Sequence, residues 1–266
     1  MNPAFRSLPS SRAQGVPQIR EVFSHTAGLN DRRPTIVHIA MRNQTILLAL
    51  LAWLFQSDVL MAGELAVKVA DKEPPKELSD AIRHTLQTQA VQLFDGDKAV
   101  FEFWFCHEVP LKSKPDSLAK ALDAIKQATL LGAASVQGDN RDYKDNGIAP
   151  GVYTMRLGLQ PSDGDHLGTS EYAWFAVLIL AKYDAKPDGI TDYKPLVKAS
   201  GKDTPSGHPL IFSLRPVSAD PGDQPKLNDP LPDHKSVVVK VPAKVEGKDE
   251  KISLAFELVY RGIGKK

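Results

Sequence analysis

The amino-acid sequence predicts an all-β fold, a β-sandwich with one or two short helical insertions. Seven or eight short apolar segments alternate their side chains with the period of a strand. Turn residues separate these segments, and no βαβ rhythm links them. About 200 residues follow the N-terminal region, a length sufficient to bury a hydrophobic core.

The N-terminal region is predicted to lie outside this domain. Residues 1–40 contain Arg but no Lys and show no periodicity, which indicates a disordered tail or an over-extended reading frame that precedes Met41. Residues 41–63 combine a basic start, the apolar run Thr45–Phe55 and a small-residue exit, the pattern of a signal peptide. An uncleaved signal anchor and a buried core helix are the alternatives. The apolar run is shorter than the roughly 20 residues that span a bilayer, so no transmembrane domain is predicted beyond the signal peptide.

Residues 64–78 are charged and Pro-containing, and they are interpreted as a linker, with a short edge strand as the alternative. A single β-sandwich domain is then expected over residues 79–266. Asp95-Gly96-Asp97 is a strong hairpin signal. The run that follows it is apolar on both faces and is expected at the centre of a sheet. The strand-like runs are Ala90–Phe94, Ala99–Cys106, Leu130–Val136, Val152–Leu159, Trp174–Ala181, Leu210–Leu214, Lys235–Val245 and Lys251–Tyr260.

Three segments are expected to be helical. Ser79–Gln89 and Ser117–Gln127 place apolar residues one turn apart behind residues that can cap a helix. One further turn is expected near Tyr193–Lys198. Gly138–Gly147 is expected to form a turn, and the Pro-rich stretch Ser218–His234 to form a long surface loop.

Composition excludes several classes of function. The formal net charge is +1 over 266 residues, and without the Arg-containing residues 1–63 the remainder is slightly acidic. This near-neutral chain without a basic stripe argues against nucleic acid as a partner. Cys106 is the only cysteine, which excludes an internal disulfide and a cysteine-cluster metal site. Fingerprints for nucleotides, serine hydrolases and zinc peptidases are absent.

Two motifs resemble metal sites without meeting their requirements. In Gly138–Gly147, a calcium loop that starts at Asp142 would place Lys144 at a ligand position. A solvated hairpin turn is the better interpretation. Cys106 and His107 are adjacent in a strand, so they point to opposite faces, unlike copper ligands. A core thiol beside a surface histidine is expected instead.

The strongest candidate for a functional site is the polar loop Gln160–Gly168, between two apolar strands. Its Asp163, Asp165 and His166, with His208, suit a divalent cation, a sugar or an acid/base pair. We add Arg156 from the preceding strand to this candidate binding set. The alternative is structural: the carboxylates cap the loop's own amides and His166 bridges to a neighbouring segment. No cofactor is predicted, and a divalent metal stays open.

One part of the chain resembles a known family. The motif DxxxNGIAPGVYTMR from Asp142, the motif QPSDGDHLG from Gln160 and the later Gly207-His208-Pro209 resemble an uncharacterised family of exported bacterial proteins. This resemblance covers roughly residues 80–216 and implies an exported β-rich fold without an assigned activity. Pro150-Gly151-x-Tyr-Thr is also similar to the strand entry of transthyretin-like and carboxypeptidase-regulatory-like sandwiches, which usually act as binding or spacer modules.

The resulting hypothesis is an exported, non-enzymatic β-sandwich, secreted or periplasmic, that binds an unknown ligand or protein in the cell envelope. A metal-dependent or acid/base hydrolase that uses Asp163, Asp165 and His166 is the alternative. A purely structural envelope component is a third reading.

Overall fold

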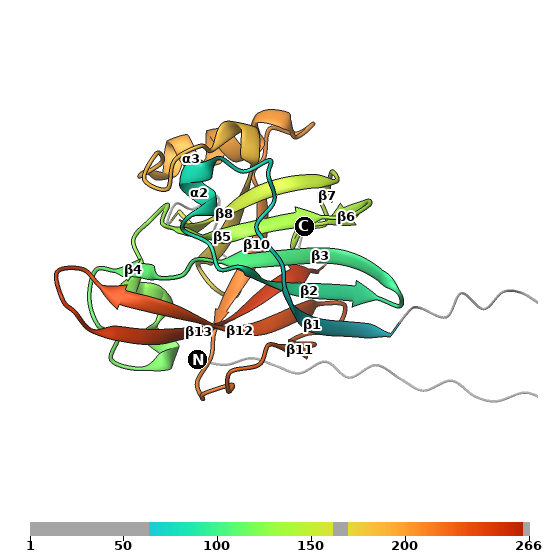
Figure 1. Ribbon diagram of the computed structural model, residues 1–266. Helices are drawn as coiled ribbons and strands as arrows, with labels where there is room; N and C mark the ends of the chain where they lie inside the picture. The colour runs from blue at the N-terminus through green and yellow to red at the C-terminus, as the bar shows by residue number, and fades with distance from the viewer. Residues whose placement is uncertain (1–63, 162–169, 263–266) are drawn as a thin grey trace, which may run out of the picture. The chain divides into compact units, whose positions relative to one another are not determined.

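The computed structural model describes residues 64–161 and 170–262. Strands make up 46 % of the described chain and helical residues only 13 %, and the predicted all-β class is confirmed. Figure 1 shows the strands, which are β1 (Leu65–Asp71), β2 (Gln89–Asp95), β3 (Lys98–Phe105), β4 (Val109–Leu111), β5 (Leu130–Val136), β6 (Asn140–Arg141), β7 (Gly147–Ile148), β8 (Gly151–Leu159), β9 (Trp174–Leu180), β10 (Leu210–Pro216), β11 (Lys226–Asn228), β12 (Lys235–Val245) and β13 (Lys251–Arg261).

Ten of these strands form one continuous antiparallel sheet in the order β1-β2-β3-β5-β8-β9-β10-β13-β12-β11, and β4 adds to β12 in parallel. The sheet coils so that its inner face packs against itself. Phe101 on β3 meets Phe212 on β10 and Tyr260 on β13 with ring centroids 5.5 and 5.4 Å apart. The end strands β1 and β11 also approach each other. The two facing layers of the sandwich are therefore two halves of one sheet.

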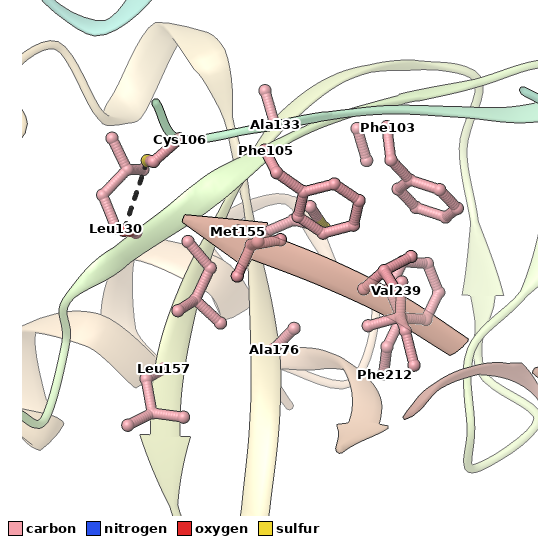
Figure 2. Close-up of a cluster of buried hydrophobic side chains, with 14 of the residues drawn as sticks. Phe103, Phe105, Cys106, Leu130, Ala133, Met155, Leu157, Ala176, Phe212 and Val239 are labelled. Atoms are coloured by element: carbon pink, nitrogen blue, oxygen red, sulfur yellow. Dashed lines mark hydrogen bonds between the residues drawn. The ribbon is translucent and has the colours of Figure 1, made fainter. Parts of the chain in front are cut away.

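The hydrophobic core fills the space inside this coil. Figure 2 shows Phe103, Met155, Phe212 and Val239, from four different strands, converging on the same volume. Alternation explains the packing, because residues two apart in a strand share a face. In β13 the even-numbered side chains are buried in this core, namely Leu254, Phe256, Leu258 and Tyr260.

Helical segments cover part of the outer face. The structure has α2 (Asp80–Arg83), α3 (Tyr193–Ser200) and the 3₁₀ turns η1 (Leu118–Lys120), η2 (Leu122–Ala124), η3 (Ala181–Tyr183) and η4 (Gly201–Asp203). Leu196 of α3 packs on Val177, Ile179 and Ile211 in a second apolar cluster over β9 and β10. Two short α-helices agree with the predicted insertions. No helix within residues 64–161 and 170–262 has the length and apolar character needed to cross a membrane.

Two local predictions are corrected. Residues 64–78 are not only a linker, since β1 pairs along its whole length with β2 at the end of the sheet, as the edge-strand alternative expects. Residues 117–127 form η1 and η2 rather than an α-helix, and Ser117 makes no side-chain cap there. The strand β8 is buried on both faces from Tyr153 to Gly158. Its outer face carries Thr154 and Arg156, whose polar groups are satisfied within the protein.

Candidate functional site

Arg156, a predicted binding residue, is fully buried in an ion pair with Asp184. Its Nε and Nη2 donate to the two carboxylate oxygens at 2.6 and 2.8 Å, and Thr154 Oγ1 donates to the same carboxylate at 2.6 Å. The remaining guanidinium N–H groups donate to three backbone carbonyls, at 2.7–2.9 Å, those of Ala128, Lys186 and Pro187. All five donors of this side chain are thus occupied. Arg156 fixes the loop after β9 and has no N–H group left for a ligand.

Of the other predicted site residues, the structure describes only His208. Asp163, Asp165 and His166 lie outside the described residues, so their proximity to His208 stays a prediction. His208 is exposed, and its backbone carbonyl accepts from Thr204 Oγ1 at 2.8 Å. Its backbone N–H donates to Ser206 Oγ at 3.3 Å. These bonds belong to a local turn.

The two motifs that resemble metal sites are structural. Asp142 is fully buried, and one carboxylate oxygen accepts the backbone N–H groups of Lys144 and Asn146, both at 2.8 Å. The other oxygen accepts from Ile211 N at 3.2 Å, so the carboxylate ties the β6–β7 turn to β10. Burial raises the pKa of Asp142. Among the described residues, no group of three or more His, Cys, Asp and Glu side chains is placed to hold a metal ion.

Cys106 is a core thiol and His107 a surface residue, as predicted. The Sγ atom lies 3.4 Å from the carbonyl oxygen of Leu130 (Figure 2). Burial raises the pKa of the thiol to about 12, although a hydrogen bond with Thr85 and the charge of Arg156 act against this shift. The thiol therefore stays protonated at neutral pH and does not act as a nucleophile.

A cavity of about 620 Å³ opens where the ends of the coiled sheet meet, and we name it the seam pocket. Its volume is in the usual range for small-molecule sites. It lies at one end of the β12–β13 hairpin, beside the first residue of β1 and the last of β2. Its lining residues are Leu65, Asp95, Leu227, Asn228, Asp229, Lys235, Ser236, Tyr260 and Arg261.

Tyr260 gives the seam pocket its most distinctive feature. The residue is only 1 % exposed, and its hydroxyl has no hydrogen-bond partner among the described residues. Burial raises the pKa of the phenol to about 12, with Arg261 opposing this shift and Asp229 and Asp95 adding to it. The hydroxyl is therefore protonated at physiological pH and available as a donor. A buried polar group without a partner is uncommon and calls for an explanation.

Charged side chains at the pocket form two pairs of different tightness. Lys235 Nζ lies 2.6 Å from Asp229, whereas Arg261 Nη1 lies 3.8 Å from Asp95, beyond hydrogen-bond distance. Ser236 Oγ and Asn228 Nδ2 donate to Glu257 at 2.5 and 2.7 Å, which uses the Ser236 hydroxyl and one of the two Asn228 amide N–H groups. The Tyr260 hydroxyl has no partner among the described residues, and Arg261 and Asp95 form only a loose pair.

A second cavity of about 600 Å³ lies near the opposite end of the β12–β13 hairpin. Cys106 and Leu130 contribute to its buried side, and Glu246, which bonds to Lys126, contributes to its rim. None of its lining residues, all of which belong to the described part of the chain, has a buried polar side-chain atom without a partner. The seam pocket is therefore the better candidate.

Sequence reasoning did not find the seam pocket. In the sequence, Tyr260 is only the last residue of the strand-like run Lys251–Tyr260, and the structure buries it. The pocket residues come from five separate stretches of sequence, and only the coiling of the sheet brings them together. The sequence did contain one chemical signal. A buried tyrosine hydroxyl normally has a hydrogen-bond partner, and the strand pattern around Tyr260 offered no such partner.

Comparison of the chain with family models, with curated proteins and with solved structures found no match.

Proposed function

We propose that this protein is an exported, non-enzymatic β-sandwich that binds a small ligand in the seam pocket, in the cell envelope. The observation that carries the proposal is the Tyr260 hydroxyl, which is buried at a cavity and has no partner in the described protein. Such a group costs stability in the free protein. A ligand that accepts a hydrogen bond from it would recover that cost on binding.

Export is supported by the order of segments along the chain. The signal-like pattern ends at Gly63, and the first strand of the sheet begins at Leu65. Cleavage directly before Glu64 would leave β1 and the pocket residue Leu65 complete. We expect the native protein to begin between Glu64 and Val67 and to fractionate as secreted or periplasmic. N-terminal mass spectrometry tests this, and peptides from residues 1–40 or an intact segment Thr45–Phe55 in the membrane fraction would contradict it.

The hydrolase alternative has no support from the described residues. It depends on Asp163, Asp165 and His166, which lie outside them, and it stays a prediction. The described His208 is exposed, and its backbone hydrogen bonds belong to a local turn.

The binding proposal is tested with Tyr260→Phe, which removes only the hydroxyl. In the free protein this change should raise stability by about 1 kcal/mol, because it deletes a buried polar atom without a partner. That corresponds to a thermal midpoint higher by roughly 2–4 °C for a domain of this size. A mixed panel of neutral, cationic, anionic and zwitterionic small molecules should contain compounds that stabilise the wild type and fail to stabilise this variant.

Tyr153→Phe is the matched control. Tyr153 is equally buried, but its hydroxyl donates to the Ala149 carbonyl at 2.8 Å and lies outside the seam pocket. Loss of the Tyr153 hydroxyl should lower the free energy of unfolding by about 1 kcal/mol, and the ligands should stabilise this variant as much as they stabilise the wild type. The proposal fails when no compound of any charge class distinguishes Tyr260→Phe from the wild type.

A further inference from the structure

We infer that the ligand of the seam pocket is a small aliphatic zwitterion, with one carboxylate and one ammonium group, such as an α-amino acid with a branched apolar side chain. This inference rests on the proposed function and specifies its ligand class. It follows from three properties of the lining: one protonated donor, one loose pair of opposite charges, and two leucine side chains.

Tyr260 is a lining residue whose hydroxyl is buried and has no partner among the described residues. Its ring packs against Phe101 with centroids 5.4 Å apart and planes inclined by 60°. Among the described residues, no other aromatic side chain lines the pocket. A saccharide would therefore find no aromatic platform on which to stack here. The protonated hydroxyl instead suits a strong acceptor, and carboxylate oxygens form the stronger, charge-assisted class of hydrogen bond.

The charged side chains of the lining favour a ligand that carries one positive and one negative group. Two acidic and two basic side chains line the pocket, so an anion alone would face Asp95 and Asp229, and a cation alone would face Lys235 and Arg261. Arg261 and Asp95, at 3.8 Å, do not bond to each other directly. Arg261 is thus available to a carboxylate together with the Tyr260 hydroxyl, and Asp95 is available to an ammonium group. The tighter Lys235–Asp229 pair, at 2.6 Å, stays closed.

The remaining part of the ligand would meet apolar side chains. Leu65 and Leu227 are half-buried, and they come from the two end strands β1 and β11. Leu227 also packs against the main core. A branched aliphatic group placed between them would bury apolar surface that the free protein leaves in contact with water. A ligand with this group and two adjacent charges has the composition of leucine or valine.

The test measures calorimetric binding of leucine and of three matched compounds to the full-length protein. Leucinamide keeps only the ammonium group, N-acetyl-leucine keeps only the carboxylate, and glucose is neutral. Leucine is expected to bind at least 10-fold more tightly than each of the other three. Tyr260→Phe should weaken leucine binding by about 10-fold, the usual loss for a hydrogen bond to a charged group.

Two charge variants identify which residue meets which group. Asp95→Asn should weaken leucine and leucinamide and should not weaken N-acetyl-leucine, because the anion loses only a repulsive neighbour. Arg261→Gln should weaken leucine and N-acetyl-leucine and should not weaken leucinamide, because the cation loses only a repulsive neighbour. Tyr153→Phe should change none of these affinities.

The outcomes separate the ligand class from the pocket itself. If glucose, leucinamide or N-acetyl-leucine binds as tightly as leucine, and Tyr260→Phe weakens that binding, the zwitterion inference is overturned and the seam pocket remains a ligand site. If none of the compounds in this set or in the mixed panel binds in a way that depends on Tyr260, both proposals fail.

Discussion

At the scale of single residues, the protein uses burial to hold ionisable groups in one state. Cys106 and Tyr260 both have a pKa raised to about 12, in each case mainly because burial disfavours the charged form. The two groups differ in their partners, since the thiol lies near the Leu130 carbonyl and the phenol has no partner among the described residues. This difference separates a core residue from a candidate binding residue.

The raised pKa of Cys106 predicts alkaline instability. The unfolded thiol loses its proton near pH 9, whereas the folded thiol retains its proton up to about pH 12. The folded state therefore binds more protons in this window, and stability falls as pH rises from 9 to 12, by up to about 4 kcal/mol. Below pH 9 the thiol has no effect on the pH dependence. Urea unfolding at pH 8 and pH 11 should show a smaller difference in Cys106→Ala than in the wild type, and equal differences would contradict the prediction.

At the scale of elements, the ion pair of Arg156 and Asp184 fastens the loop after β9 to the centre of the sheet. The side chain crosses from β8 to the carbonyls of Lys186 and Pro187, so the path of this loop depends on one buried cation. The adjacent α3 then covers β9 through Leu196. Arg156, which the sequence placed in a candidate binding set, instead holds the loop that precedes the covering helix α3.

Removal of one partner of the Arg156–Asp184 ion pair should therefore destabilise the fold strongly. Asp184→Asn is expected to cost about 3–5 kcal/mol, because it leaves the Arg156 charge buried without its counterion. Hydrogen exchange should also become faster in the 184–190 loop than in β12. Lys182→Gln is the control, since Lys182 pairs with Asp203 at the surface, where water screens the two charges, and its loss should destabilise the fold far less. Similar losses of stability in Asp184→Asn and Lys182→Gln would show that the Arg156–Asp184 ion pair does not hold this loop in place.

The sequence predicted elements well where the signal was local. The bounds of β5 and β12 match the predicted runs, and the hairpin at Asp95-Gly96-Asp97 is present. The prediction for residues 117–127 was wrong, because i to i+3 spacing also suits the 3₁₀ turns that form there. The candidate site was not predictable in the same way. Arg156 looked available because its partner Asp184 lies 28 positions further along the chain.

At the scale of the whole described domain, one coiled sheet supplies both the core and the pocket. The inner aromatic residues connect strands that are far apart in the sheet order, and the seam pocket forms where the two ends of that order approach. Ligand contacts at Leu65 and Leu227 would therefore link the first and last strands of the sheet. No single strand carries enough of the pocket to reveal it in the sequence.

The coiling of the sheet predicts energetic coupling between its two halves. Phe101 and Phe212 meet edge to face, with ring planes inclined by 89°, although three strands separate β3 from β10 in the sheet. A double-mutant cycle with Phe101→Leu and Phe212→Leu, measured by urea unfolding, should give a coupling energy of about 0.5–1.5 kcal/mol. Phe101→Leu combined with Leu196→Ala, on the outer cluster, should be additive within about 0.5 kcal/mol. Equal coupling in both cycles, or none in either, would contradict a core in which opposite halves of the sheet stabilise each other through direct ring contact.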